Sequence, residues 1–112
     1  MQAKPLSRDF AVSEQIAPGD VDAIAQAGYR SIVCARPDGE GGPAQPRFAE
    51  IEAAAAAAGI KAAYIPIVPG QMTRADVEAF KGLLATLPGP VFGYCRSGAR
   101  AASLWQAAQP GA

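Results

Sequence analysis

Histidine is absent from the 112-residue sequence, and this absence excludes several common kinds of active site. Without histidine there is no Cys–His pair, no Ser–His–Asp triad and few of the usual zinc sites. We therefore expect neither a metal nor a cofactor. Any reactive cysteine must be activated by arginine, by lysine or by backbone amide groups.

The sequence also lacks an excess of charge and a long apolar segment. Ten basic and ten acidic residues give a formal net charge of zero, so we expect neither nucleic acid nor a membrane as partner. A locally positive site for a small anionic substrate is compatible with this balance. No apolar run is long enough to span a membrane, and Met1–Pro5 lacks the apolar core of a signal peptide. A soluble cytoplasmic protein with a single domain over residues 1–112 is therefore expected.

Cysteine is scarce, with only Cys34 and Cys95 present. Two cysteines do not make a disulfide framework, and the cytoplasm keeps thiols reduced. Cys34 lies in a short apolar, β-branched run, where cysteine usually packs as a small apolar side chain. A resolving role for Cys34 stays open, because two strand ends could bring it near Cys95.

What the sequence does contain is a regular alternation of strand-like and helix-like segments, separated by glycine and proline. Such alternation predicts an α/β fold with a largely parallel sheet of about four strands. The expected strands are 10–16, 31–35, 60–68 and 91–94, and the expected helices are 18–27, 48–58, 74–87 and a last one from 99 onward. In such sheets, ligand sites form at the carboxyl ends of the strands.

The last strand runs directly into the segment Cys95-Arg96-Ser97-Gly98-Ala99-Arg100, which precedes the last helix. A strand-to-helix loop directs several backbone N–H groups and the positive end of the helix dipole to one point. A thiolate is favoured there, so Cys95 is the expected nucleophile. Gly98 lets the backbone turn closely around a ligand, and Arg100 can give two hydrogen bonds to an oxyanion. An anionic substrate is expected to contact Arg96, Ser97, Gly98 and Ala99, with the Ser97 hydroxyl a candidate donor to the thiolate.

Four motifs carry a resemblance to a known family. They are Ser13-Glu14-Gln15-Ile16, Ala35-Arg36-Pro37-Asp38-Gly39-Glu40, Ile65-Pro66-Ile67 with Pro69-Gly70-Gln71, and Tyr94-Cys95-Arg96-Ser97-Gly98-Ala99-Arg100. Together they resemble a small bacterial domain family that is grouped with the phosphatases and is found fused to the sulfur dioxygenase part of the beta-lactamase-hydrolase-like proteins. The resemblance covers nearly the whole chain, and the last motif is its most specific part. It implies the three-layer, cysteine-phosphatase-like fold of the dual-specificity phosphatases.

Two activities are associated with such a domain, namely phosphomonoester hydrolysis and sulfur transfer of the rhodanese type. Cysteine phosphatases place five residues between the cysteine and the arginine, and they usually have histidine before the cysteine. Here four residues separate Cys95 from Arg100, and Tyr94 stands in place of the histidine. Four is the spacing of the rhodanese loop, and the shorter loop suits a persulfide on the cysteine better than a phosphoryl group.

The general acid of a phosphatase offers a second comparison. In dual-specificity phosphatases an aspartate follows the Ile-Pro-Val strand and protonates the leaving oxygen, but Pro69 occupies that place here. Asp76 is near in sequence, yet it fits the first turn of a helix better than a general acid. Asp38 and Glu40 would supply an acid only if their loop folded over the site. Arg36 and Asp38 follow a strand end, so we expect this loop to approach the cysteine.

These departures favour a rhodanese-type sulfurtransferase. The Cys95 thiolate would take the outer sulfur of thiosulfate or of a persulfide, and Arg100 would hold the anionic part of the substrate. A thiol such as glutathione would accept the sulfur, and the resemblance makes a sulfur dioxygenase a candidate partner. Two alternatives stay open: a phosphatase that works through a phosphocysteine, and a non-catalytic anion-binding module.

Overall fold

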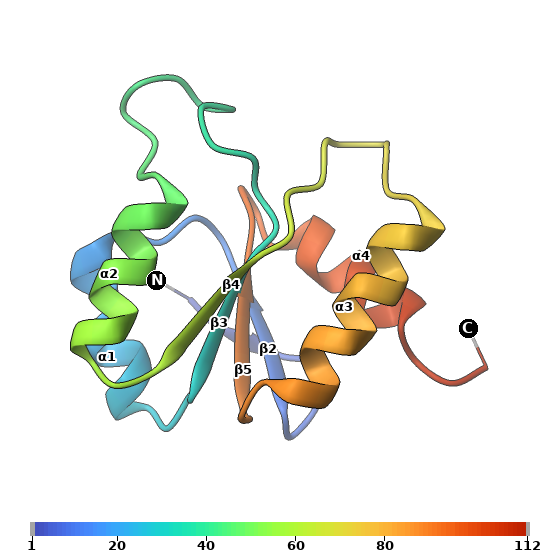
Figure 1. Cartoon of the computed structure of the whole chain (residues 1–112), viewed down its shortest axis with the longest axis horizontal. Coiled ribbons are helices and arrows are strands. Elements are labelled where there is room, and N and C mark those ends of the chain that lie inside the picture. The colour runs from blue at the N-terminus through green and yellow to red at the C-terminus, as the bar shows by residue number, and fades with distance from the viewer. Residues whose placement is uncertain (1, 112) are drawn as a thin grey trace.

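In the computed structural model, which describes residues 2–111, a five-stranded sheet stands between two pairs of helices (Figure 1). The strands are β1 (Lys4–Pro5), β2 (Phe10–Ser13), β3 (Ser31–Cys34), β4 (Lys61–Tyr64) and β5 (Val91–Tyr94). The helices are α1 (Val21–Gln26, preceded by a 3₁₀ turn at Pro18–Asp20), α2 (Phe48–Ala57), α3 (Arg74–Thr86) and α4 (Ala99–Ala107). The predicted three-layer α/β architecture is confirmed.

β5 occupies the centre of the sheet, whose strand order is β1-β2-β5-β3-β4. β2 and β3 run parallel to β5 on either side, and β4 runs parallel to β3. β1 pairs with β2 in the antiparallel direction, and the sequence analysis missed it because it is an exposed, two-residue strand containing a proline. Since parallel strands end at the same edge, the segments that follow β2, β3, β4 and β5 meet at the top of Figure 1.

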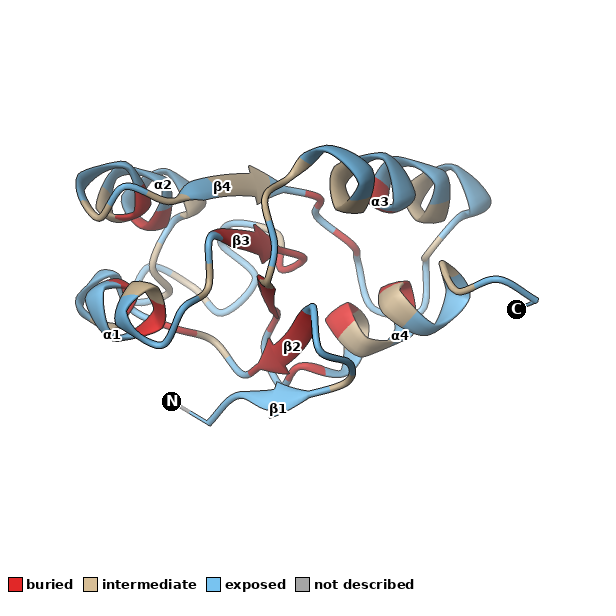
Figure 2. Cartoon of the chain, turned by 90° about the horizontal axis from the view of Figure 1, so that it is seen from below, coloured by how far each residue is buried: buried red, intermediate tan, exposed pale blue. Residues whose placement is uncertain are grey.

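The apolar core lies in two layers, one on each face of the sheet. α1 and α2 cover one face, where Ile51 is fully buried, and α3 and α4 cover the other, where Leu104 is fully buried. Figure 2 shows buried residues along β2 and β3 and on the helix surfaces that face the sheet. Burying one such side chain stabilises a fold by about 1.5–3 kcal/mol. This two-sided burial holds β5, and therefore the loop that follows it, in a fixed position.

The first strand is shorter than the sequence predicts. β2 ends at Ser13 rather than at Ile16, because the chain turns there toward the end of β5. The Gln15 amide donates to the Arg96 carbonyl at 3.2 Å instead of continuing the ladder. The turn brings the Ser13–Ile16 segment beside the loop that begins at Cys95.

The third predicted strand is also too long at its carboxyl end. β4 ends at Tyr64 rather than at residue 68, because Pro66 has no N–H to donate to the ladder. The amides of Ile65 and Ile67 still donate to carbonyls of the β3 segment, each at 2.9 Å. The other predicted strands and helices agree with the structure to within one residue at each end. None of the helices within residues 2–111 is long and apolar enough to cross a membrane.

Candidate active site

The segment from Cys95 to Arg100, which we call the cradle, leaves the carboxyl end of β5 and enters α4. Cys95 is fully buried and belongs to the core on the α3 and α4 face. The Gly98 amide donates a hydrogen bond to Cys95 Sγ at 3.1 Å. This contact directs a backbone N–H donor at the Cys95 sulfur.

The turn of the cradle depends on a glycine at position 98. Gly98 precedes the first residue of α4 and has φ +96°, a left-handed conformation that other residues rarely adopt. A Cβ atom there would also lie 3.3 Å from the Ser13 carbonyl oxygen. Glycine at this position therefore allows the amide to point at the Cys95 sulfur and the backbone to pass close to β2.

Two amides of the cradle are free to bind an anion. The backbone N–H groups of Arg96 and Ser97 donate to no acceptor within residues 2–111. The Ser97 hydroxyl accepts a hydrogen bond from the Ala99 amide at 3.3 Å, and within residues 2–111 it makes no hydrogen bond to the Cys95 sulfur. A hollow between the β1–β2 hairpin and α4 is lined by Ser97, Gly98 and Ala99. Arg96 lines a different pocket, which it shares with Arg36 and Arg100.

Arg100 is held by a carboxylate that comes from the loop after β3. Its Nη1 and Nη2 donate to the two oxygens of Glu40 at 2.7 Å each, and its Nη1 also donates to the Ile67 carbonyl at 2.8 Å. Arg36 Nε donates to the same carboxylate at 3.0 Å, and Arg36 Nη1 donates to Gln15 Oε1 at 3.1 Å. We call Arg36, Glu40 and Arg100 the clasp.

The clasp is largely shielded from solvent, and its charges support one another. The side chains of Arg36, Glu40 and Arg100 are 10%, 21% and 14% exposed. The hydrogen bond from Arg100, with further help from Arg36, lowers the pKa of the Glu40 carboxyl below its usual value. The hydrogen bond to Glu40 in turn raises the pKa of Arg100, and Cys95 contributes in the same direction. The Glu40–Arg100 contact therefore favours the charged forms of both partners.

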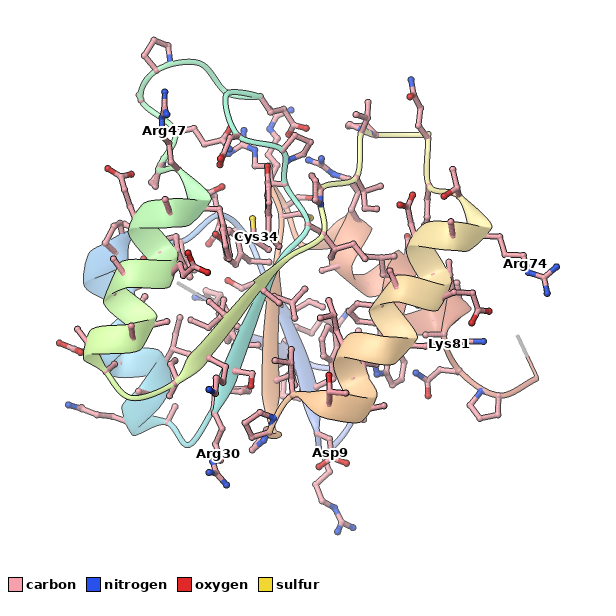
Figure 3. All side chains as sticks on the ribbon, viewed as in Figure 1. Asp9, Arg30, Cys34, Arg47, Arg74 and Lys81 are labelled. Atoms are coloured by element: carbon pink, nitrogen blue, oxygen red, sulfur yellow. The ribbon has the colours of Figure 1, made fainter. Side chains whose placement is uncertain are left out.

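A pocket of about 770 Å³ opens at this edge of the sheet. It has three guanidinium groups against one carboxylate, and its remaining wall is mostly apolar; the lining residues are Arg36, Pro37, Glu40, Gly41, Val68, Pro69, Arg96 and Arg100. Figure 3 shows Arg30 at the opposite end of the strands, and Arg74 and Lys81 on the outer side of α3. The protein therefore has a locally positive site despite its balanced charge.

Two predicted auxiliary carboxylates lie away from the cradle. Asp38 Oδ1 accepts from the Phe48 amide at 2.8 Å, so it caps the start of α2. Asp76 Oδ2 accepts from the Thr73 amide at 2.9 Å, and the Asp76 amide donates to Thr73 Oγ1 at 3.1 Å, which makes a capping box at the start of α3. Neither aspartate lines the pocket formed by Arg36, Glu40 and Arg100. The loop that carries Asp38 does reach the cradle, because its Glu40 binds Arg100.

Cys34 lies near Cys95 in the sheet but on the opposite face. Cys34 pairs with Tyr94 in the β3–β5 register, and the side chains of Cys34 and Tyr94 belong to the core on the α1 and α2 side. Both cysteines are free thiols, and Figure 3 shows Cys34 near the carboxyl end of β3. Burial raises the pKa of Cys34 and also that of Tyr94. Cys34 therefore packs in the core on the face opposite Cys95, as does Tyr94, which stands where phosphatases have their histidine.

The sequence analysis missed two acceptors that hold the clasp, the side-chain oxygen Oε1 of Gln15 and the backbone carbonyl of Ile67. Both lie in motifs that carry the family resemblance, Ser13–Ile16 and Ile65–Ile67, so a signal for them was present. Within residues 2–111 no group of three or more histidine, cysteine, aspartate or glutamate side chains is arranged to hold a metal ion.

Comparison with known sequences places relatives over nearly the whole chain. The profile of a family described as "beta-lactamase hydrolase-like protein, phosphatase-like domain" matches residues 3–112. A beta-lactamase hydrolase-like protein of Agrobacterium fabrum is 36% identical over 105 residues, and one of Xylella fastidiosa is 37% identical over 105 residues. Each alignment covers 94% of this chain and 24% of the relative, so the chain spans about a quarter of the length of these curated relatives.

Solved structures share the same fold. A protein of Neisseria meningitidis Z2491 named as a "putative phosphatase" is 35% identical, with a TM-score of 0.83 over 91% of this chain and 72% of that one. A protein of Shewanella putrefaciens CN-32 with the same name is 19% identical, with a TM-score of 0.80 over 96% of this chain and 66% of that one. Tk-PTP in its active form is 18% identical, with a TM-score of 0.61 over 98% of this chain and 86% of that one. The last two likenesses concern the fold alone.

Proposed function

Because the chain belongs to the family of phosphatase-like domains of the beta-lactamase hydrolase-like proteins, we propose that it is a cysteine-nucleophile enzyme in which Cys95 attacks the substrate. Within this class we propose rhodanese-type sulfur transfer, from thiosulfate or a persulfide to a thiol. The phosphatase-like fold is compatible with sulfur and with phosphorus chemistry. The choice between them therefore depends on the residues of the cradle and the clasp.

Three features support Cys95 as the nucleophile. It stands at the carboxyl end of the central strand, directly before a helix, where an anion is favoured. Its sulfur accepts a hydrogen bond from the Gly98 amide. Cys95 contributes to the raised pKa of Arg100, which places this guanidinium in the electrostatic surroundings of the sulfur. Because the sequence has no histidine, these backbone and guanidinium groups are the activators of the thiolate.

The observation that carries the choice of sulfur is the charged state of the carboxylate in the pocket. Hydrolysis of an alkyl phosphate needs a group that gives a proton to the leaving oxygen. Glu40 is held by Arg100 and Arg36, which lower its pKa, so near neutral pH it has no proton to give. Pro69 stands where a phosphatase of this type has its acid, and Asp38 caps α2. Sulfite leaves thiosulfate as a dianion and needs no proton.

The sulfur transfer takes place in two displacements. The Cys95 thiolate attacks the outer sulfur of thiosulfate; a new S–S bond forms at Cys95, the original S–S bond breaks, and its electron pair leaves with sulfite. An acceptor thiolate then attacks the outer sulfur of the Cys95 persulfide, which becomes the persulfide of the acceptor and returns Cys95 as a thiolate. Arg100 and the free amide of Arg96, two residues that line the same pocket, hold the sulfonate oxygens and stabilise the charge that develops on them.

The size of the pocket supports an organic thiol as the acceptor. Its volume of about 770 Å³ lies within the range of about 300–1,000 Å³ that is usual for organic ligands, and thiosulfate alone is far smaller. A thiol with carboxylates, such as glutathione, fits the positive charge of Arg96 and the apolar wall at Val68 and Pro69. A sulfur dioxygenase, which the family resemblance suggests as a partner, would consume the persulfide product.

The experiment that tests this proposal compares two reactions of the same preparations. Sulfite release from thiosulfate in the presence of glutathione is measured beside hydrolysis of an aryl phosphate. We expect the wild-type protein to release sulfite, Cys95→Ser to be inactive, and Arg100→Lys to lose about 10²–10³-fold in kcat, as is usual when an oxyanion donor is removed. Glu52→Gln, which changes an exposed carboxylate on α2, is the matched control and retains full activity.

Other outcomes would identify the alternatives. Hydrolysis of the aryl phosphate that depends on Cys95, without sulfite release from thiosulfate, would establish the phosphatase reading, which the name of the Neisseria structure favours. No turnover of either substrate, together with sulfate binding that is lost in Arg100→Lys, would establish a non-catalytic anion-binding module.

A further inference from the structure

Glu40 binds one edge of the Arg100 guanidinium and leaves the other edge open. From this geometry we infer that Glu40 is a positioning residue, which directs the open edge of Arg100 at Cys95 and at the bound anion. The inference rests on the proposed role of Arg100 in anion binding, but it holds whether sulfur or phosphorus is transferred.

A guanidinium group has two edges that can each give a pair of parallel N–H bonds to an oxyanion. Glu40 takes the end edge of Arg100, formed by Nη1 and Nη2, and the Ile67 carbonyl takes a further hydrogen of Nη1. The side edge, formed by Nε and the second hydrogen of Nη2, donates to no backbone or carboxylate acceptor within residues 2–111. The donors left for the Cys95 sulfur and for an anion are therefore those of the side edge.

The environment of Glu40 is built to hold this arrangement. Arg36, which as a whole residue is 8% exposed, donates to Glu40 through Nε and to Gln15 through Nη1. A Cβ atom on Gly41 would lie only 2.7 Å from Arg36 Nη2, so the glycine leaves room for this guanidinium. The ion pair of Lys81 and Glu78 on α3, by contrast, is 47% and 58% exposed. Exposed pairs of that kind stabilise little, whereas the clasp side chains are no more than 21% exposed and are held by several hydrogen bonds.

Replacing Glu40 by glutamine keeps the size of the side chain but changes what it can bind. One carboxylate oxygen becomes an amide NH₂ group, which faces an Nη donor of Arg100 instead of accepting from it. The bidentate contact is lost, and the guanidinium plane is free to rotate away from the cradle. A misplacement of this kind can reduce the rate of an oriented reaction by up to about 10²-fold.

The sign of the effect separates positioning from simple charge. If Glu40 only contributed negative charge, its removal would make the pocket more positive and would increase the preference of Cys95 for anionic reagents. If Glu40 positions Arg100, the same substitution decreases that preference. The measurement is the ratio of the alkylation rates of Cys95 by iodoacetate, an anion, and by iodoacetamide, its neutral counterpart. In both reactions the thiolate displaces iodide, and peptide mass mapping distinguishes Cys95 from Cys34.

We expect Glu40→Gln to lower the iodoacetate-to-iodoacetamide ratio by about tenfold, within the loss that misplacement can cause. Glu40→Asp, which keeps the charge but has a shorter reach, should give an intermediate ratio, and Glu52→Gln should match the wild-type ratio. Thermal unfolding shows whether each variant is folded, and Glu40→Asp serves as the test if Glu40→Gln is not. A ratio that is unchanged or increased in the folded Glu40 variants would overturn the inference.

The outcomes keep this inference separate from the proposed function. A lowered ratio in Glu40→Gln without a persulfide at Cys95 in the wild-type protein would support positioning and refute sulfur transfer. A persulfide in the wild-type protein with an unchanged ratio in Glu40→Gln would support sulfur transfer and refute positioning.

Discussion

Replacing Gly98 by alanine perturbs the conformation on which the cradle depends. Gly98 has φ +96°, and holding another residue in such a region costs about 1–3 kcal/mol. The added Cβ would lie 3.3 Å from the Ser13 carbonyl oxygen, so β2 and the cradle must move apart by a few tenths of an ångström. With both effects present, we expect the free energy of unfolding to fall by about 2–3 kcal/mol.

Urea unfolding of Gly98→Ala beside two control variants divides this loss into its parts. Gly28→Ala has a similar φ, +102°, but no atom lies within 4 Å of the new Cβ, so it reports the backbone strain alone. The difference between Gly98→Ala and Gly28→Ala is the cost of the contact with Ser13. Sulfur transfer should decrease in Gly98→Ala but not in Gly28→Ala, because only the first variant moves the amide that donates to Cys95.

The result that would refute this reasoning is specific. If Gly98→Ala is no less stable than Gly28→Ala and transfers sulfur at the wild-type rate, the cradle does not need the left-handed turn. The hydrogen bond from the Gly98 amide would then have no part in activating the thiolate.

Three further predictions concern other parts of the molecule. Gly82 lies in α3, where a new Cβ would meet no atom within 4 Å and φ is ordinary for a helix, so Gly82→Ala should raise the free energy of urea unfolding by about 0.5–1 kcal/mol. A loss of stability would contradict the open space beside Gly82. The pKa of Glu40 is lowered in the folded state, so the stability that its charge contributes is present above the unfolded pKa near 4.5 and is lost as the pH falls through the folded pKa. In unfolding measurements below pH 4.5, the stability difference between wild type and Glu40→Gln should therefore shrink. A difference that stays constant would show that it does not come from the charge of Glu40. Cys34→Ala should still form a persulfide in intact-mass measurements, because Cys34 is on the face of the sheet opposite Cys95, and loss of the persulfide in a folded variant would show that the two thiols cooperate.

Local sequence signals were sufficient where neighbouring residues decide the structure. Thr73 and Asp76 satisfy each other's backbone amides, so the start of α3 could be predicted from residues three positions apart. The apolar run Val91–Tyr94, followed at once by Cys95, predicts correctly that Cys95 stands at the end of a strand. Both features concern contacts within one turn or one strand, which a single sequence records directly.

Contacts between distant segments could not be predicted in the same way. Glu40 and Arg100 are 60 positions apart, and their pairing depends on how the loop after β3 folds over the cradle. Asp38 and Glu40 are near neighbours of the same charge in that loop. The backbone amide of Phe48 donates to Asp38, and the guanidinium of Arg100 donates to Glu40. Which carboxylate meets which donor depends on how the folded sheet places the loop, and the sequence alone does not indicate it.

The central claim, that Cys95 carries sulfur, is tested most directly by the intact mass of the protein after incubation with thiosulfate. We predict a gain of one sulfur atom that maps to the Cys95 peptide, disappears when glutathione is added and is absent in Cys95→Ser. The contrary result is an unchanged mass in a protein that hydrolyses an aryl phosphate through Cys95.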